Sequence, residues 1–130
     1  MKNDVETWLE FAERDLGAAR AMLHSRIYTH ACFEAQQVIE KALKALLLRQ
    51  GKRIPKIHDL LDLLSLTEEP ALASFTADLT LINSYYLPVR YPDTLNGGPQ
   101  VFDPTPADAK AAVDSAEVLF KRIEEIVRPD

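Results

Sequence analysis

The sequence predicts an all-α protein, an up-and-down helical bundle of three long helices plus one or two shorter ones. Apolar residues recur at helical spacing in residues 4–24, 31–48 and 106–126. The alternation of apolar and polar residues that marks a half-buried strand is not found in any long segment. Most of the connections are short, which favours antiparallel neighbouring helices.

The composition indicates a single folded domain, residues 1–130. A chain of this length buries roughly two-thirds of its unfolded surface around one core. Apolar residues make up 47% of the chain and charged residues 27%, as in ordinary globular proteins. The net charge of −5 excludes indiscriminate binding to a nucleic acid backbone. A local basic patch is offered by Lys41, Lys44, Arg49, Lys52, Arg53 and Lys56.

The cysteine content and the amino terminus indicate a cytoplasmic protein. Cys32 is the only cysteine, so it cannot form an intrachain disulfide, and its place in an apolar arc predicts a small core residue in a reducing compartment. The first residues, MKNDVETWLEF, lack an apolar signal core. No apolar run approaches membrane-spanning length, so no association with a membrane is expected.

The first helix is predicted over residues 4–24, with Asn3 or Asp4 as its cap. Its apolar face is interrupted by Asp15, which falls inside the arc that should be buried. A buried carboxylate without a partner costs stability. We therefore expect Asp15 to meet a cation, with Lys44 and Arg90 as the candidates.

The second helix is predicted over residues 31–48, and Gly51 is suited to a left-handed cap at its end. Alanine and aliphatic side chains fill one continuous face, which predicts burial. The other face is polar but also carries Phe33, Leu47 and Leu48. A helix with this second apolar stripe is expected to contact two neighbours. The surplus of apolar positions also favours a homodimer.

Two short helices are predicted after Pro55. The segment KIHDLLDLLSL, residues 56–66, has the pattern of a short amphipathic helix, and Thr67 is the predicted start of another helix that ends near Tyr86. The next segment, residues 88–106, contains five prolines and a Gly-Gly pair. It predicts a long loop, and loops of this length are often functional.

The last helix has the clearest start in the sequence. Thr105 is in the cap position, Pro106 occupies the first helical position, and Asp108 stands three residues after the cap. This combination predicts a capping box. Apolar residues then recur at spacings of three and four as far as Ile126.

Few groups in the sequence suit catalysis. The three histidines lack metal-ligand spacing and phosphate-binding glycine loops are missing, so no metal or other cofactor is expected. His58 has two interpretations. It can act with Arg53 on a phosphodiester, the guanidinium stabilising charge while the imidazole moves a proton. Alternatively, His58 and Asp59 start a short helix, capping it or packing on the second helix, and we favour this interpretation.

The tetrapeptide RYPD in the long loop is the main candidate for ligand binding. Arg90 offers a planar, permanently charged fork for phosphate or carboxylate. Tyr91 is available for stacking and Asp93 for orienting the guanidinium. In the alternative interpretation, RYPD is a turn in which Arg90 pairs internally with Asp15 or Glu40.

Three residues of the second helix are secondary candidates for ligand binding. Glu40 and Lys44 have the spacing of a surface ion pair that supports a helix by about 0.2–0.5 kcal/mol, which is the role we favour for them. Gln36 and Glu40 border the apolar face. They are therefore placed to line a cleft together with Arg90.

Taken together, these features resemble the HEPN family, the small helical domains named for higher eukaryotes and prokaryotes nucleotide-binding. The resemblance rests on the first helix with Trp8 and Asp15, the run FEAQQVIEKALKALL, HDL at residues 58–60, RYPD, and an alanine-rich last helix. It implies a helical bundle that commonly dimerises. It also implies a minimal nucleotidyltransferase as partner, in a two-component, toxin–antitoxin-like system.

Many HEPN proteins resemble metal-independent ribonucleases that use an arginine and a following histidine. Arg90 matches that arginine, but no histidine follows it. Tyr91 is a poor substitute because an unperturbed tyrosine has a pKa of roughly 10. The resemblance therefore implies a non-catalytic module that binds a nucleotide, another phosphate-bearing ligand or its partner protein through Arg90.

Two alternatives to that module stay open. The first is a toxin-like ribonuclease that cleaves RNA with Arg90 and a histidine from elsewhere, either His58 or one across a dimer. The second is an interaction scaffold without a ligand, in which Arg90 and Asp15 only hold the bundle together.

Overall fold

The computed structural model describes residues 3–85 and 103–128, and within these ranges the chain forms helices and no strand. The all-α prediction is therefore confirmed. No helix in the described ranges combines the length and the apolar character that a membrane crossing requires. The helices are α1 (Asp4–His24), α2 (Tyr28–Arg49), α3 (Leu60–Thr67), the 3₁₀ helix η1 (Pro70–Phe75), α4 (Thr76–Asn83) and α6 (Pro106–Val127).

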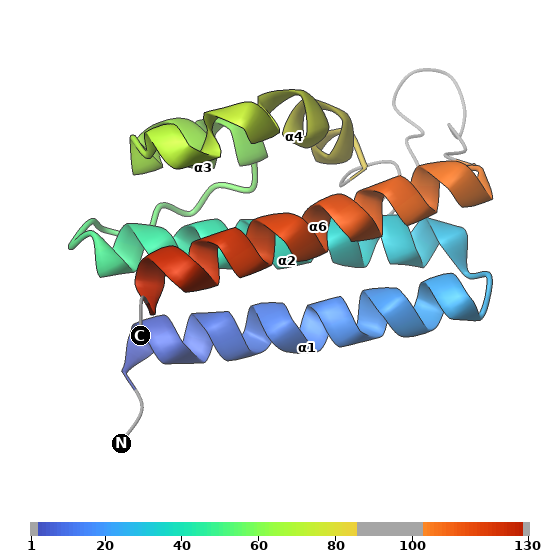
Figure 1. Cartoon of the computed structure of the whole chain (residues 1–130), viewed down its shortest axis with the longest axis horizontal. Coiled ribbons are helices and arrows are strands. Elements are labelled where there is room, and N and C mark those ends of the chain that lie inside the picture. Colours follow the sequence, from blue (N-terminus) through green and yellow to red (C-terminus); the bar gives the residue numbers. More distant parts are fainter. Residues whose placement is uncertain (1–2, 86–102, 129–130) are drawn as a thin grey trace.

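The three long helices α1, α2 and α6 lie side by side and form the body of the bundle (Figure 1). Helix α2 is central, because it packs against α1 and α6 and also contacts α3 and α4. The short helices form a further layer at the top of this view. Packing on several sides confirms the prediction that the second helix meets more than one neighbour.

The core is built from small and aliphatic side chains, which let the long helices approach closely. Leu47, from the second apolar stripe of α2, is 1% exposed, and Cys32 is fully buried as predicted. Phe33 and Leu48 are half-buried. Four alanines of α2 have no exposed surface: Ala31, Ala35, Ala42 and Ala45.

The predicted caps at the starts of α1 and α6 and after the end of α2 are present. The Asn3 side chain accepts a hydrogen bond from the amide of Glu6 (2.8 Å) at the start of α1. At the start of α6, Thr105 and Asp108 form the predicted capping box through two bonds of 3.0 Å. Gly51 follows α2 with a φ of 78°, so it adopts the expected left-handed conformation.

The predicted helix start at Thr67 is wrong. Thr67 is the last residue of α3, where its hydroxyl donates to the carbonyl of Leu64 (2.7 Å). Glu68 then adopts a left-handed conformation with a φ of 49°, which ends the helix. Pro70 begins the 3₁₀ helix η1, and α4 begins only at Thr76.

Candidate functional site

A row of polar side chains on α2 is buried where this helix faces the segment leading into α3. Gln36, Glu40 and Lys44 are spaced four residues apart, so they lie on one side of the helix. They are 0%, 5% and 6% exposed. Polar groups buried to this degree require partners, and charged groups require them most.

The Glu40 carboxylate is the centre of this polar network. Its Oε2 accepts a hydrogen bond from Nζ of Lys44 (3.0 Å), and its Oε1 accepts one from Nε2 of Gln36 (3.3 Å). Nδ1 of His58 lies 3.1 and 3.0 Å from Oε1 and Oε2. One carboxylate therefore joins three side chains, two from its own helix and one that follows it by eighteen residues. Below we call Gln36, Glu40, Lys44 and His58 the Glu40 network.

His58 is held in place by the structure around the start of α3. The next residue, Asp59, caps this helix by accepting from the amides of Leu61 (2.9 Å) and Asp62 (3.0 Å). The amide of Asp62, followed by the side chain of Asn83 and the amide of Leu61, lowers the pKa of Asp59. Nε2 of Gln36 also donates to the backbone carbonyl of His58 (3.3 Å). The backbone of His58 is therefore held in place, while its side chain remains 55% exposed.

Lys44 makes a second contact, with the first helix. Its Nζ lies 5.7 Å from the centre of the Trp8 ring, within range of a cation–π interaction. The prediction that Glu40 and Lys44 form a surface ion pair is thus wrong in its location, because Trp8 and the segment before α3 cover this side of α2. The two residues do pair at the predicted spacing, but as a buried pair.

Asp15 pairs with a different cation from the two expected. Its Oδ2 accepts from Nζ of Lys41, one turn of α2 before Lys44. Glu34 is the third member of this group. Burial, followed by the charge of Asp15 and a hydrogen bond with it, raises the pKa of Glu34, and Lys41 partly opposes that shift. Lys41 therefore compensates the charge of Asp15, which interrupts the apolar face of α1.

The structure brings together four of the predicted site residues, places Asp15 in a separate pair with Lys41, and leaves three outside its described part. Gln36, Glu40, Lys44 and His58 form one network, and the contact of His58 with Glu40 agrees with the favoured interpretation that His58 packs on the second helix. Arg90, Tyr91 and Asp93 lie outside the described residues, so the proposed cleft between Arg90 and Glu40 stays a prediction. Among the described residues, no group of histidine, cysteine and acidic side chains is arranged to hold a metal ion.

The fold and the Glu40 network define a small all-helical domain that presents a histidine from the segment leading into its third helix. The family comparison gives this class a name: the chain belongs to the HEPN domain family, whose match covers residues 5–126. The resemblance in the sequence is thereby confirmed.

Two solved structures are similar over nearly their whole length. An archaeal HEPN homologue is 34% identical, with a TM-score of 0.77 over 98% of this chain and 100% of the homologue. A protein from Thermus thermophilus is also 34% identical, with a TM-score of 0.80 over 95% of this chain and 98% of that protein. A comparison with curated proteins gives no significant match.

Proposed function

We propose that this HEPN domain binds a phosphate-bearing ligand, a nucleotide or an RNA strand, on the side of the bundle where His58 lies. The Glu40–His58 contact carries the proposal, because it holds an exposed imidazole over a buried charged network. Nδ1 faces the carboxylate, and we propose that the ligand contacts the exposed part of the imidazole. In this proposal Gln36, Glu40 and Lys44 position His58 and do not touch the ligand.

Arg90 is the proposed anchor for the phosphate. Its guanidinium is always charged and can contact two phosphate oxygens at once, and its place in RYPD matches the arginine of the HEPN resemblance. Tyr91 is proposed to stack on a base, and Asp93 to orient the guanidinium. Family membership also supports a cytoplasmic homodimer with a minimal nucleotidyltransferase as its partner in a two-component system.

A titration of the purified protein tests this binding site. A fluorescently labelled single-stranded RNA and ATP serve as probes, at low salt because phosphate contacts weaken as salt rises. We expect Arg90→Ala and His58→Ala each to weaken binding of one probe at least tenfold. Arg122→Ala is the matched control because Arg122 is exposed on α6, and it should bind as the wild type does. Equal binding by all four proteins would contradict the proposal and favour a ligand-free scaffold.

The contact between Glu40 and His58 also favours a second candidate function, that of a ribonuclease. In this candidate function Glu40 orients the ring through Nδ1, and Nε2 of His58 accepts the proton of a ribose 2′-hydroxyl as the hydroxyl oxygen attacks the adjacent phosphorus. The bond to the 5′ oxygen then breaks and this oxygen takes up a proton, while Arg90 stabilises the charge on the phosphate. This arrangement would supply the histidine that is missing after Arg90.

An RNA cleavage assay in the presence of a chelator separates the two functions. The non-catalytic module predicts binding without cleavage by the wild-type protein. The ribonuclease predicts cleavage that His58→Gln reduces at least a hundredfold while RNA binding changes little, since general acid–base catalysis typically contributes about 10²–10⁴-fold. Cleavage that persists in His58→Gln would exclude His58 as the base.

A further inference from the structure

The short-helix layer, residues 59–85, carries the whole net charge of the chain. It contains five carboxylates and no lysine, arginine or histidine, whereas the rest of the sequence balances fifteen acidic against fifteen basic residues. An acidic surface of this kind attracts cations and repels phosphates. The layer therefore favours a positively charged partner over a phosphate-bearing one. Its five carboxylates belong to Asp59, Asp62, Glu68, Glu69 and Asp78.

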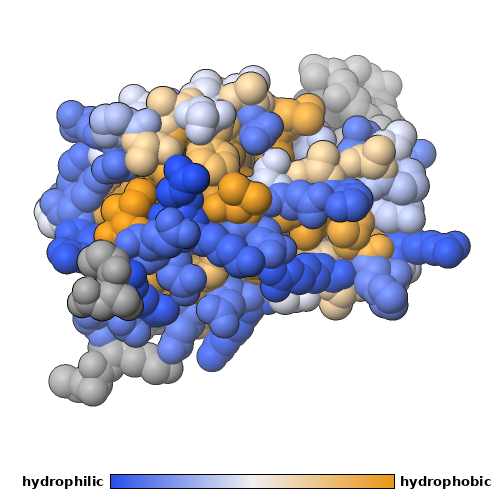
Figure 2. Space-filling model, in the orientation of Figure 1, coloured by the Kyte–Doolittle hydropathy of each residue, from blue (hydrophilic) through white to orange (hydrophobic). Residues whose placement is uncertain are grey.

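A groove of about 550 Å³ opens between α3 and η1, where the chain turns from one helix into the other. Its floor and sides are mostly apolar, and the half-buried Leu61 and Leu64 each leave part of their surface open to it. Figure 2 shows orange and pale surface among the polar groups at the top of the view, where the short helices lie. The lining includes Leu61, Leu64, Pro70 and Ala73, with Glu68 and Glu69 at the turn.

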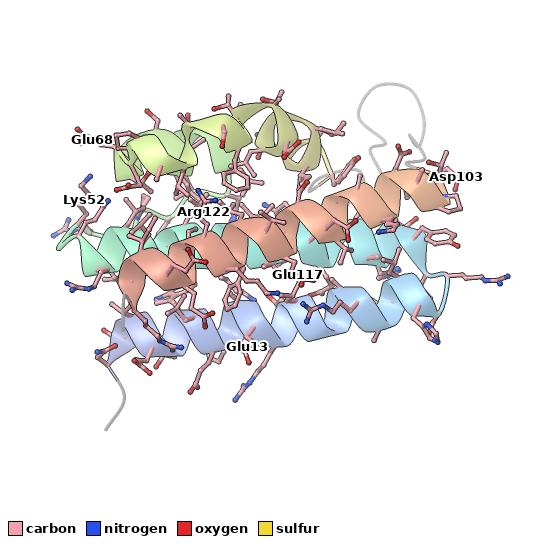
Figure 3. All side chains as sticks on the ribbon, viewed as in Figure 1. Glu13, Lys52, Glu68, Asp103, Glu117 and Arg122 are labelled. Atoms are coloured by element: carbon pink, nitrogen blue, oxygen red, sulfur yellow. The ribbon has the colours of Figure 1, made fainter. Side chains whose placement is uncertain are left out.

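The charges at this end of the groove are negative in sum. Among the described residues, Lys52 forms an ion pair at this end: its Nζ donates to the Leu66 carbonyl (2.6 Å) and lies 3.4 Å from Glu68 (Figure 3). Glu68 is nevertheless 81% exposed, and Glu69 adds a second carboxylate. The carboxyl end of α3 points to the same turn and contributes a partial negative charge.

These features select the kind of molecule that fits the groove. A nucleotide or nucleic acid is disfavoured because its phosphates would meet carboxylates. A small molecule that needs hydrogen-bond donors would find few, since the lining side chains offer only the hydroxyls of Ser65 and Thr76, and the Thr76 hydroxyl already donates to the Ala73 carbonyl (2.9 Å). An apolar side chain followed by a cation matches both the floor and the rim.

We propose that the groove between α3 and η1 docks an amphipathic segment of a partner protein, which inserts leucine-like side chains and places lysine or arginine beside Glu68 and Glu69. Helices that bind in this way lay an apolar stripe into a groove and use flanking charges for orientation. The proposal goes beyond the phosphate-binding site and does not depend on it. The groove would then join the domain to another protein.

A helical peptide probe tests the groove directly. The probe is an 18-residue peptide of leucine and lysine with leucines at positions i, i+3, i+4 and i+7, and its fluorescence anisotropy reports binding. We expect saturable binding that Ala73→Trp weakens at least tenfold, because the indole fills the groove. The double variant Glu68→Lys/Glu69→Lys should weaken binding similarly. A peptide with glutamate in place of lysine should not bind.

Matched controls separate groove binding from general attraction to an acidic protein. Ala21→Trp adds the same ring at an exposed position of α1. Glu13→Lys reverses a charge on α1, across the bundle from Glu68 in Figure 3. Both should bind within twofold of the wild type. Equal binding by Ala73→Trp and Ala21→Trp, or no saturable binding at all, would overturn the proposal. A dimer that Ala73→Trp dissociates would also overturn it, because the occupant would then be a second copy of the chain.

Discussion

Nδ1 of His58 lies 3.1 and 3.0 Å from the two carboxylate oxygens of Glu40. This contact ties the segment before α3 to the middle of α2 and places a buried ion pair directly behind an exposed imidazole. Removing one member of such a pair leaves the other charge buried without compensation, which costs far more than a surface pair contributes. The Glu40 network should therefore be important both for stability and for the position of His58.

We predict that Glu40→Gln destabilises the protein by about 3 kcal/mol because Lys44 loses its counter-charge while it remains buried. The double variant Glu40→Gln/Lys44→Met should recover most of this loss, since it removes the uncompensated charge. Urea unfolding of the wild type, both single variants and the double variant measures the coupling. Additive effects would show that the two side chains do not act as a pair.

Glu34 should make stability depend on pH in the direction opposite to most carboxylates. Its pKa is raised in the folded protein by burial and by Asp15, so the folded state binds the proton more tightly than the unfolded state. The stability contributed by this proton is present below the unfolded pKa and is lost as pH rises through the folded pKa. We expect Glu34→Gln to unfold at a higher urea concentration than the wild type at pH 7. This advantage should vanish near pH 4, and a constant difference would contradict the assignment.

The residues that follow the ends of α1 and α2 allow the cost of a left-handed backbone to be compared at two equivalent positions. Arg26 and Gly51 each follow a helix end with positive φ, 64° and 78° respectively. A side chain is strained in this conformation, so Arg26→Gly should stabilise the protein by about 0.5–1 kcal/mol. Gly51→Ala should destabilise it by about 1 kcal/mol, because no heavy atom lies within 4 Å of the added Cβ and only the backbone is strained. Thermal unfolding measures both, and changes of the same sign would be incompatible with this explanation.

Cys32 should be chemically inert while the protein is folded. Burial, with a smaller effect from Asp108, raises the pKa of the Cys32 thiol to about 12. Only about one molecule in 10,000 would then carry the reactive thiolate at pH 8. We expect Ellman's reagent to modify this thiol quickly in guanidinium chloride and very slowly in native buffer. Fast modification in native buffer would mean that this part of the core opens readily.

The sequence predicts the starts of α1 and α6 well because their caps are local, whereas α2 and α3 begin at Tyr28 and Leu60 and not at the predicted residues 31 and 56. Thr105, Pro106 and Asp108 contain within four residues all the chemistry that starts α6. The apolar arcs are equally local, since helical spacing alone decides which side chains share a face. Thr67 shows the limit of this reasoning. A threonine before acidic residues and a proline resembles a helix start. Here, however, Thr67 is the last residue of α3, and the 3₁₀ helix η1 begins at Pro70.

The Glu40 network could not be predicted from spacing because it depends on how separate elements pack. A helical wheel shows that Glu40 and Lys44 share a face, but not that Trp8 and the segment before α3 cover it. The same holds for Asp15, whose choice of Lys41 over Lys44 depends on the relative rotation of α1 and α2. Residues 36, 40 and 44 on one side of a helix, with HDL downstream, form the signal that could have indicated the network.

NMR spectroscopy of the imidazole groups during an RNA titration tests the proposed binding site most directly. The chain has three histidines, and His24 and His30 are exposed beside the turn between α1 and α2, so they serve as internal controls. The proposal predicts that the ring signals of His58 shift and saturate with the RNA, while those of His24 and His30 stay in place. Arg90→Ala should abolish the shift. Saturable RNA binding that leaves the His58 signals unchanged would contradict the proposed site.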